Sequence, residues 1–192
     1  MSLVNKKNKF VYKLFKYITL TPLILFNPIP TNQDALKAAI EFQWDSNENF
    51  KQLKWFQTEE KKNFRNKIFL FLRSSDRKTG LIKISLKVPD RFTPQIKKEK
   101  ISLCEVRVGG FSKKTKCLKT IPTEIEIDKE NNKVDIFPAS PLPAGKENYA
   151  IHLKVSNPKR GGLYQFHGFG QSSGKVPVSY YLGSWTVITD LQ

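Results

Sequence analysis

The sequence has few of the residues from which metal centres are usually built. Its 192 residues include two cysteines and two histidines. These four residues are Cys104, Cys117, His152 and His167. The two pairs are separated by 12 and 14 intervening residues, and neither gap matches a zinc finger or a zinc ribbon. We therefore predict no metal site and no cofactor.

The sequence also lacks the short motifs that mark several classes of enzyme. It contains no phosphate-binding loop, no glycine-rich dinucleotide fingerprint and no HExxH zinc-protease motif. The segment Gly170–Gly174 does match the G-x-S-x-G pattern of a nucleophile elbow, with Ser172 at its centre. An elbow needs a following helix and a later histidine, whereas no helix is predicted here and both histidines come earlier. We predict a polar loop, no catalytic residue and a protein that is not an enzyme.

Acidic residues are scarce, since 17 Asp and Glu stand against 33 Lys and Arg, for a net charge of +16. Residues 1–35 hold five of the lysines and one of the acids, which leaves 28 and 16 in the remainder. Such an excess attracts anionic lipids, acidic polysaccharides or nucleic acids. The basic residues are spread over the whole chain, so a solvated basic surface without a specific partner is the simplest interpretation.

One cluster of lysines lies close to an aromatic residue. Phe111 is followed by Lys113, Lys114, Lys116 and Lys119. RNA-recognition modules also place base-stacking aromatic residues on a sheet, and no such set is discernible. We predict no nucleic-acid partner and keep Lys113 and Lys114 as a candidate binding patch.

No apolar run reaches the roughly 20 residues that a stable membrane span needs. The segment Tyr17–Phe26 has ten residues and contains Pro22. It follows the lysine-rich segment Asn5–Lys16 and precedes Asn27–Pro30, which is the order of parts in a Sec signal peptide. An A-x-A cleavage site and a twin-arginine pair are both missing. We predict that residues 1–35 are a signal peptide or an uncleaved N-terminal membrane anchor, and that the protein is exported to the periplasm or the cell envelope.

Beyond residue 36 the hydrophobic pattern has a period of two residues, as in half-buried strands. Apolar and polar residues alternate at 82–88 and at 149–155, where His152 is on the polar side and is expected to be exposed. Segments 123–128 and 133–137 predict a hairpin with its turn at 129–132.

Other segments add strands of different kinds. Ile68–Leu72 is apolar throughout and predicts a central strand buried on both faces, and Tyr180–Ile188 predicts the closing strand. Further strands are expected near residues 38–43, 51–57, 102–108 and 163–169. Many short strands separated by Pro and Gly turns predict a single all-β domain over residues 36–192, an antiparallel β-sandwich of broadly immunoglobulin-like architecture.

The two cysteines are predicted to form a disulfide. Export places Cys104 and Cys117 in an oxidising compartment. The 12 residues between them include Gly109 and Gly110 and are able to form a hairpin loop that brings the thiols together. Such a bridge typically stabilises a domain by about 2–4 kcal/mol.

The C-terminal part of the chain resembles a known family. The matching stretches are Phe137–Gly145, Asn157–Phe166 with its Asn-Pro and Gly-Gly-x-Tyr-x-Phe elements, and Tyr181–Gly183. They look like a cyanobacterial family of exported proteins that carries a domain of unknown function. The resemblance covers residues 80–188 and implies a β-rich domain of the cell envelope, with no catalytic residues to carry over. The sequence departs from the family pattern at 171–174, where members tend to have a Pro-Ala-Gly turn, and in its two cysteines.

The same stretch has a direct physical interpretation. Asn157-Pro158 starts a turn, and Gly161-Gly162 allows positive backbone φ angles. Tyr164 and Phe166 are two residues apart and are expected to face the core.

Together these features predict a non-catalytic structural or binding module of the cell envelope, whose partner is an envelope protein or an anionic polymer. The alternative is an enzyme acting on envelope polysaccharide, or a factor that assembles membrane proteins. The predicted binding surface is the glycine-rich loop from Gly168 to Tyr180, with Phe169, Gln171 and Tyr180 as contact residues. The competing surface is the basic patch at Lys113 and Lys114.

Overall fold

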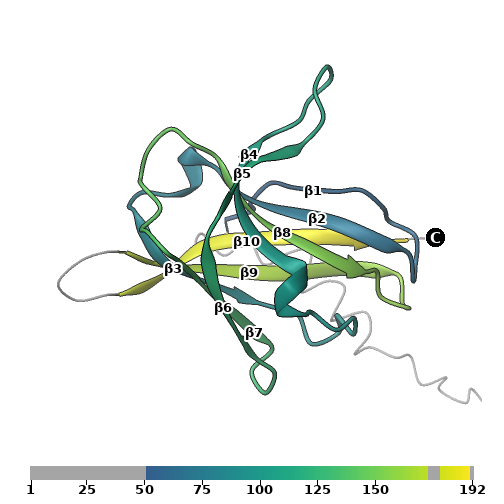
Figure 1. Cartoon of the computed structure of the whole chain (residues 1–192). Coiled ribbons are helices and arrows are strands. Elements are labelled where there is room, and N and C mark those ends of the chain that lie inside the picture. Colours follow the sequence, from purple (N-terminus) through teal and green to yellow (C-terminus); the bar gives the residue numbers. More distant parts are fainter. Residues whose placement is uncertain (1–50, 173–177, 191–192) are drawn as a thin grey trace, which may run out of the picture. The chain divides into compact units, whose positions relative to one another are not determined.

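A computed structural model describes residues 51–172 and 178–190 of the chain, which fall within one compact unit (Figure 1). The predicted signal or anchor segment, residues 1–35, and the strand expected near 38–43 lie outside the described residues. The described part is built of strands, with two single-turn 3-10 helices, η1 (Ser74–Asp76) and η2 (Lys98–Lys100).

The strands form two five-stranded sheets, and the strand pairs within each sheet are antiparallel. Sheet I has the order β1-β2-β8-β4-β5, with the bounds Trp55–Gln57, Arg65–Leu72, Tyr149–Ser156, Ile101–Arg107 and Lys116–Ile121. Sheet II has the order β10-β9-β3-β7-β6, with the bounds Ser179–Thr189, Gly162–Ser172, Leu81–Lys87, Lys133–Pro138 and Thr123–Asp128.

Several connections cross from one sheet to the other. Only Pro122 separates β5 of sheet I from β6 of sheet II, so the chain passes between the edges of the two sheets with almost no loop (Figure 1). Two antiparallel sheets joined by such crossings have the broad architecture of immunoglobulin-like sandwiches. The predicted fold is therefore confirmed, as are the hairpin formed by β6 and β7 and the closing strand β10.

The core lies between the sheets because alternate residues of each strand point inward. Sheet I contributes Leu70 and Ile151, which are fully buried, and sheet II contributes Ile84, Phe166 and Trp185. Burying one such side chain is worth about 1.5–3 kcal/mol. The indole Nε1 of Trp185 donates a hydrogen bond of 3.0 Å to the carbonyl oxygen of Phe71, which joins the sheets through the core.

The outer face of sheet I is also apolar. Phe69 and Phe71 of β2 pack there with Ala150 of β8 and Cys104 of β4 in a second buried cluster. The prediction that β2 is buried on both faces is confirmed. The prediction that His152 is exposed is wrong, because its ring stacks on Phe69 with centroids 4.4 Å apart and the residue is buried.

The Asn-Pro and Gly-Gly-x-Tyr-x-Phe elements have structural roles at one end of the sandwich. Asn157 is buried, accepts a hydrogen bond of 2.8 Å from the amide of buried Asn66, and donates to the carbonyls of Glu59 and Lys61. These contacts hold the β1–β2 turn against the start of the β8–β9 connection.

The second element behaves as predicted. Gly162 has a φ of 150°, in the region that favours glycine. Tyr164 and Phe166 face the core, and the hydroxyl of Tyr164 donates to the carbonyl of Arg160.

Candidate functional site: a basic arm beside an aromatic hollow

The hairpin between β4 and β5, residues 107–119, is strongly basic, and we call it the basic arm. The arm projects beyond the rest of the sandwich (Figure 1). It contains no acidic residue and five basic ones, all exposed: Arg107, Lys113, Lys114, Lys116 and Lys119. Because like charges on one small element reinforce each other's potential, the arm attracts anions.

The tip of the arm is a tight loop closed by two internal hydrogen bonds. The N–H of Gly110 donates to the carbonyl of Lys113 at 2.9 Å, and the N–H of Gly109 donates to the hydroxyl of Thr115 at 3.1 Å. A Cβ at position 109 would lie 2.6 Å from the Thr115 nitrogen, so glycine is required there. Phe111 is thereby presented to solvent at the tip, with a relative exposure of 109%.

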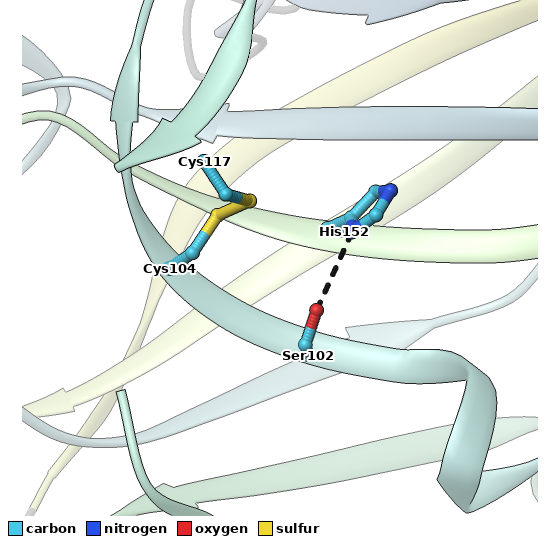
Figure 2. Close-up of a disulfide and its surroundings, with 4 residues drawn as sticks. All are labelled: Ser102, Cys104, Cys117 and His152. Carbon is cyan, nitrogen blue, oxygen red and sulfur yellow. Dashed lines mark hydrogen bonds between the residues drawn. A yellow bond between two sulfur atoms is a disulfide. The ribbon is translucent and has the colours of Figure 1, made fainter. Parts of the chain in front are cut away.

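A disulfide crosses the base of the arm. Cys104 of β4 is bonded to Cys117 of β5, with Cα atoms 5.6 Å apart (Figure 2). The bond runs diagonally across the ladder, because Cys117 pairs with Val106 and Cys104 pairs with Thr120. Cys104 is buried in the outer cluster of sheet I, so the bond ties the arm to the packed part of that sheet.

A hollow of about 850 Å³ lies between the arm and strand β1. Four aromatic side chains line it, Trp55, Phe56, Phe71 and Phe111. Three lysines, Lys54, Lys113 and Lys114, also line it. No acid and no histidine is among its described lining residues, so the hollow combines apolar walls with positive charge. The structure thus brings the predicted pair Lys113 and Lys114 together with aromatic residues that lie far away in sequence.

His152 lies on the same face of sheet I, in the neighbourhood of the disulfide (Figure 2). Its Nδ1 is 3.4 Å from the hydroxyl of Ser102, and its buried Nε2 has no hydrogen-bond partner. Burial, together with the positive charges of Lys154 and Lys67, lowers the pKa of His152 to about 4. The ring is therefore neutral at neutral pH and acts as part of the packing.

The predicted binding loop from Gly168 to Tyr180 is shorter than expected. Strand β9 continues to Ser172 and β10 begins at Ser179, so Phe169 and Gln171 are strand residues, and residues 173–177 lie outside the described part. The glycines of this segment are compatible with a strand because they have no Cβ, which leaves room for side chains of the core. A Cβ on Gly168 would lie 2.6 Å from the Trp185 ring.

The three residues predicted to share that loop do not form one cluster. Tyr180 packs against the core, and its hydroxyl hydrogen-bonds with Thr79. Phe169 lies on the other face of sheet II, where its ring is 5.6 Å from that of Tyr181.

A polar trio that the sequence did not reveal lies beside Phe169. The hydroxyl of buried Ser184 is 2.6 Å from the Nδ1 of His167 and 2.6 Å from the Tyr181 hydroxyl. Burial and the charge of Lys87 lower the pKa of His167. The trio depends on the register of β9 and β10, which places His167 opposite Ser184 across 17 residues of sequence.

A second hollow, of about 920 Å³, lies at the β1–β2 turn and contains the carboxylates of Glu59, Glu60 and Asp190. Glu59 accepts hydrogen bonds from the N–H groups of Glu60 and Lys61, and the bond from Lys61 is the main reason that its pKa is lowered. Asp190 lies 3.6 Å from the Lys62 ammonium. The lowered pKa keeps Glu59 ionised, so Glu59 does not provide the protonated carboxyl group that an acid catalyst needs.

Two negative findings apply to the described ranges, 51–172 and 178–190. No three His, Cys, Asp or Glu side chains there are grouped so that they could hold a metal ion. None of the helices there has the length and apolar character needed to cross a membrane.

An antiparallel β-sandwich with a basic, disulfide-linked arm is thus the class of domain that the structure defines. By sequence, residues 40–188 match the model of a protein family of unknown function, DUF2808, and the chain belongs to that family. No curated protein matches the sequence significantly.

Solved structures with similar strand arrangements share little sequence with the chain. BslA, a bacterial hydrophobin, is 14% identical over 73% of this chain and 95% of its own, with a TM-score of 0.47. The collagen-binding domain of a Staphylococcus aureus adhesin is 15% identical over 70% of this chain and 95% of its own, with a TM-score of 0.37. ACE19, the collagen-binding subdomain of an Enterococcus faecalis surface protein, is 10% identical over 70% of this chain and 96% of its own, with a TM-score of 0.40.

Proposed function

We propose that the protein is an exported, non-catalytic binding module, and that its basic arm holds it to an anionic component of the cell envelope. The observation that carries this proposal is the charge of the arm, with five exposed basic residues and no acid between positions 107 and 119. Export rests on the order of the charged and apolar segments before residue 30. The cyanobacterial origin implied by the sequence resemblance stays a prediction.

The hollow supports binding better than catalysis. An enzyme acting on polysaccharide would use converging carboxylates. The described lining of the hollow instead consists of aromatic, basic and small residues. Aromatic walls give contact area and lysines give charge recognition, which are the two requirements of a site for an anionic partner.

The arm is also suited to its role by its rigidity. A loop closed by two hydrogen bonds and tied at its base by a disulfide loses little conformational entropy when it binds. The lysine charges are thus displayed on a fixed element rather than on a free tail.

The test is binding of the full chain to immobilised dextran sulfate, with uncharged dextran as the matched polymer. We expect salt-dependent binding to the sulfated polymer only, and at least tenfold weaker binding by K113E/K114E. The control variant is K97E/K98E, which reverses two exposed lysines at η2, before β4 and outside the arm. Equal losses in the two variants would show that total charge, and not the arm, governs binding, and would overturn the proposal.

A further inference from the structure

Phe111 is the most exposed large apolar residue of the described chain, and its position has no role in the fold. Its neighbours in the tip loop are glycine, serine and lysine, and no described residue shields its ring. The ring is held in water at the tip of a loop that two hydrogen bonds close, so it is available for contact with an apolar surface. Leu118, on the β5 side of the same arm, is also exposed.

The lysines near Phe111 indicate the kind of surface that its ring would enter. Lys113, Lys114 and Lys116 follow it within five residues, and none of them is neutralised by an acid on the arm. Long lysine side chains are able to keep their ammonium groups at the level of lipid phosphates while an apolar neighbour sits deeper. Anionic lipids attract such a cluster, and the attraction grows with each basic residue near the surface.

The projection of the arm makes this contact sterically simple. The tip extends beyond the edges of both sheets, so it can reach a flat surface without a clash from the body of the sandwich (Figure 1). A sugar chain would satisfy the lysines but would cover only part of a ring as exposed as that of Phe111. The hydrocarbon boundary of a bilayer removes the whole ring from water.

We propose that the tip of the basic arm inserts Phe111 into the interface of an anionic lipid bilayer, with Lys113, Lys114 and Lys116 on the lipid phosphates. This inference rests on the proposed function and names the anionic component as a membrane surface. It assigns Phe111 the apolar contact and the three lysines the electrostatic contact.

The chain contains a matched control for Phe111. Phe64, in the β1–β2 turn, is a second exposed phenylalanine, and Lys61 lies over its ring at 5.8 Å. Within five positions of Phe64, two acids offset part of the charge of four basic residues: Glu59 and Glu60 against Lys61, Lys62, Arg65 and Lys67. Phe64 thus has comparable apolar character in a mixed charge environment. An interface that selects the basic arm distinguishes the two positions.

The experiment compares F111W and F64W in the full chain, each read as the difference from the wild-type tryptophan emission. Vesicles of phosphatidylcholine and phosphatidylglycerol (about 7:3) are compared with pure phosphatidylcholine, and brominated acyl chains report depth. We expect a blue shift and quenching for F111W on the anionic vesicles, and neither change for F64W. We also expect F111A to bind these vesicles about tenfold more weakly than the wild type.

Each other outcome contradicts the inference in a recognisable way. An unchanged F111W spectrum on vesicles that do sediment the protein would place the lipid contact elsewhere, for example on the predicted N-terminal anchor. Equal quenching at both positions would show unspecific adsorption. If K113E/K114E loses dextran sulfate binding selectively while F111W is silent, the lipid inference fails and the proposed function stands; if that selectivity is missing, the proposed function fails.

Discussion

The outer faces of the two sheets differ in chemistry, although both sheets alternate residues in the same way. On sheet I the outer face is apolar, with Phe69, Phe71 and Cys104 buried in one cluster. On sheet II the outer face is a polar network, in which the carboxylate of Asp135 accepts a hydrogen bond of 2.5 Å from Ser85 and pairs with two lysines.

The two histidines of the protein show what this difference means. On sheet I, His152 stacks on Phe69 and its pKa falls to about 4, mainly because burial penalises the charged ring. On sheet II, burial also lowers the pKa of His167, but its Nδ1 lies 2.6 Å from the Ser184 hydroxyl, closer than the 3.4 Å between His152 Nδ1 and the Ser102 hydroxyl. Sheet I therefore buries a histidine whose Nε2 has no hydrogen-bond partner, whereas sheet II gives its histidine a short hydrogen bond. We expect sheet I to respond more strongly to changes on its outer side.

The largest expected effect compares one phenylalanine on each outer face. Phe71→Ala removes a buried ring from sheet I and should lower the free energy of unfolding by about 3–4 kcal/mol. Phe169→Ala removes a half-buried ring from sheet II and should cost about 1.5 kcal/mol. Urea unfolding followed by circular dichroism measures both. Equal losses would mean that the two faces contribute alike.

The disulfide exists only on the outer side of sheet I among the described residues. Replacing both Cys104 and Cys117 with alanine should lower the free energy of unfolding by about 3 kcal/mol, because the bridge closes a loop with a sequence separation of 13. Reduction of the wild-type protein should give the same loss. Non-reducing peptide mapping provides the direct check, and two free thiols in the native protein would contradict the prediction.

Acid should act on sheet I through His152. In the unfolded chain its pKa is near 6.5, and in the folded protein it is about 4, so the unfolded state binds the proton first as pH falls. The contribution of neutral His152 to the free energy of unfolding is nearly complete above pH 6.5 and is lost as the pH falls from 6.5 to 4. Between pH 7 and pH 5 the expected loss is about 2 kcal/mol. His167 titrates in the same direction, so the difference between the wild type and His152→Phe isolates this residue. Identical slopes of the free energy of unfolding against pH in the two proteins would contradict this prediction.

The smallest expected effect is on the polar face of sheet II. Burial raises the pKa of Asp135, but hydrogen bonds from Ser85, Lys83 and Lys133 outweigh it, and the net pKa is lowered. Its ionised form therefore stabilises the fold above a pH of about 4 and loses this contribution below that value. Asp135→Asn should lower the free energy of unfolding at pH 7 by about 1 kcal/mol. A Lys133→Gln variant, which keeps the other two partners, should lose less.

The alternation of β3, the β6–β7 hairpin and the doubly buried β2 could be predicted from the sequence, because each depends on local periodicity. The half-buried strand predicted at 149–155 is wrong for its first part, because residues 149–153 of β8 are all buried. The burial of His152 could not be deduced from its own strand. It depends on Phe69, which is placed opposite it by the pairing of β2 with β8 across more than 80 residues. The apolar run of β2 was the available sign that sheet I has a second buried face.

The candidate site shows the same limit. Lys113 and Lys114 could be predicted as a basic patch, since charge clusters are visible in sequence. Trp55 and Phe71 could not be assigned to that patch, because only the position of the arm beside β1 brings them to one hollow. The prediction of a loop over 168–180 is wrong for residues 168–172, because sequence alone does not distinguish a glycine in a strand from a glycine in a turn. At Gly168 the reason for glycine is the Trp185 ring, which occupies the space that a Cβ would need.

The diagonal disulfide at the base of the arm also has a mechanical consequence. β5 is an edge strand, and an edge strand alone is peeled away when a load is applied to a hairpin tip. A load on the tip of this arm is able to separate β4 from β5 only as far as the covalent bond, and beyond that point it is carried by β4 into β8 and the middle of sheet I. An attachment made at the tip would therefore be held by the sheet as a whole, and a pulling force at the tip would extend a short loop before it strained the fold.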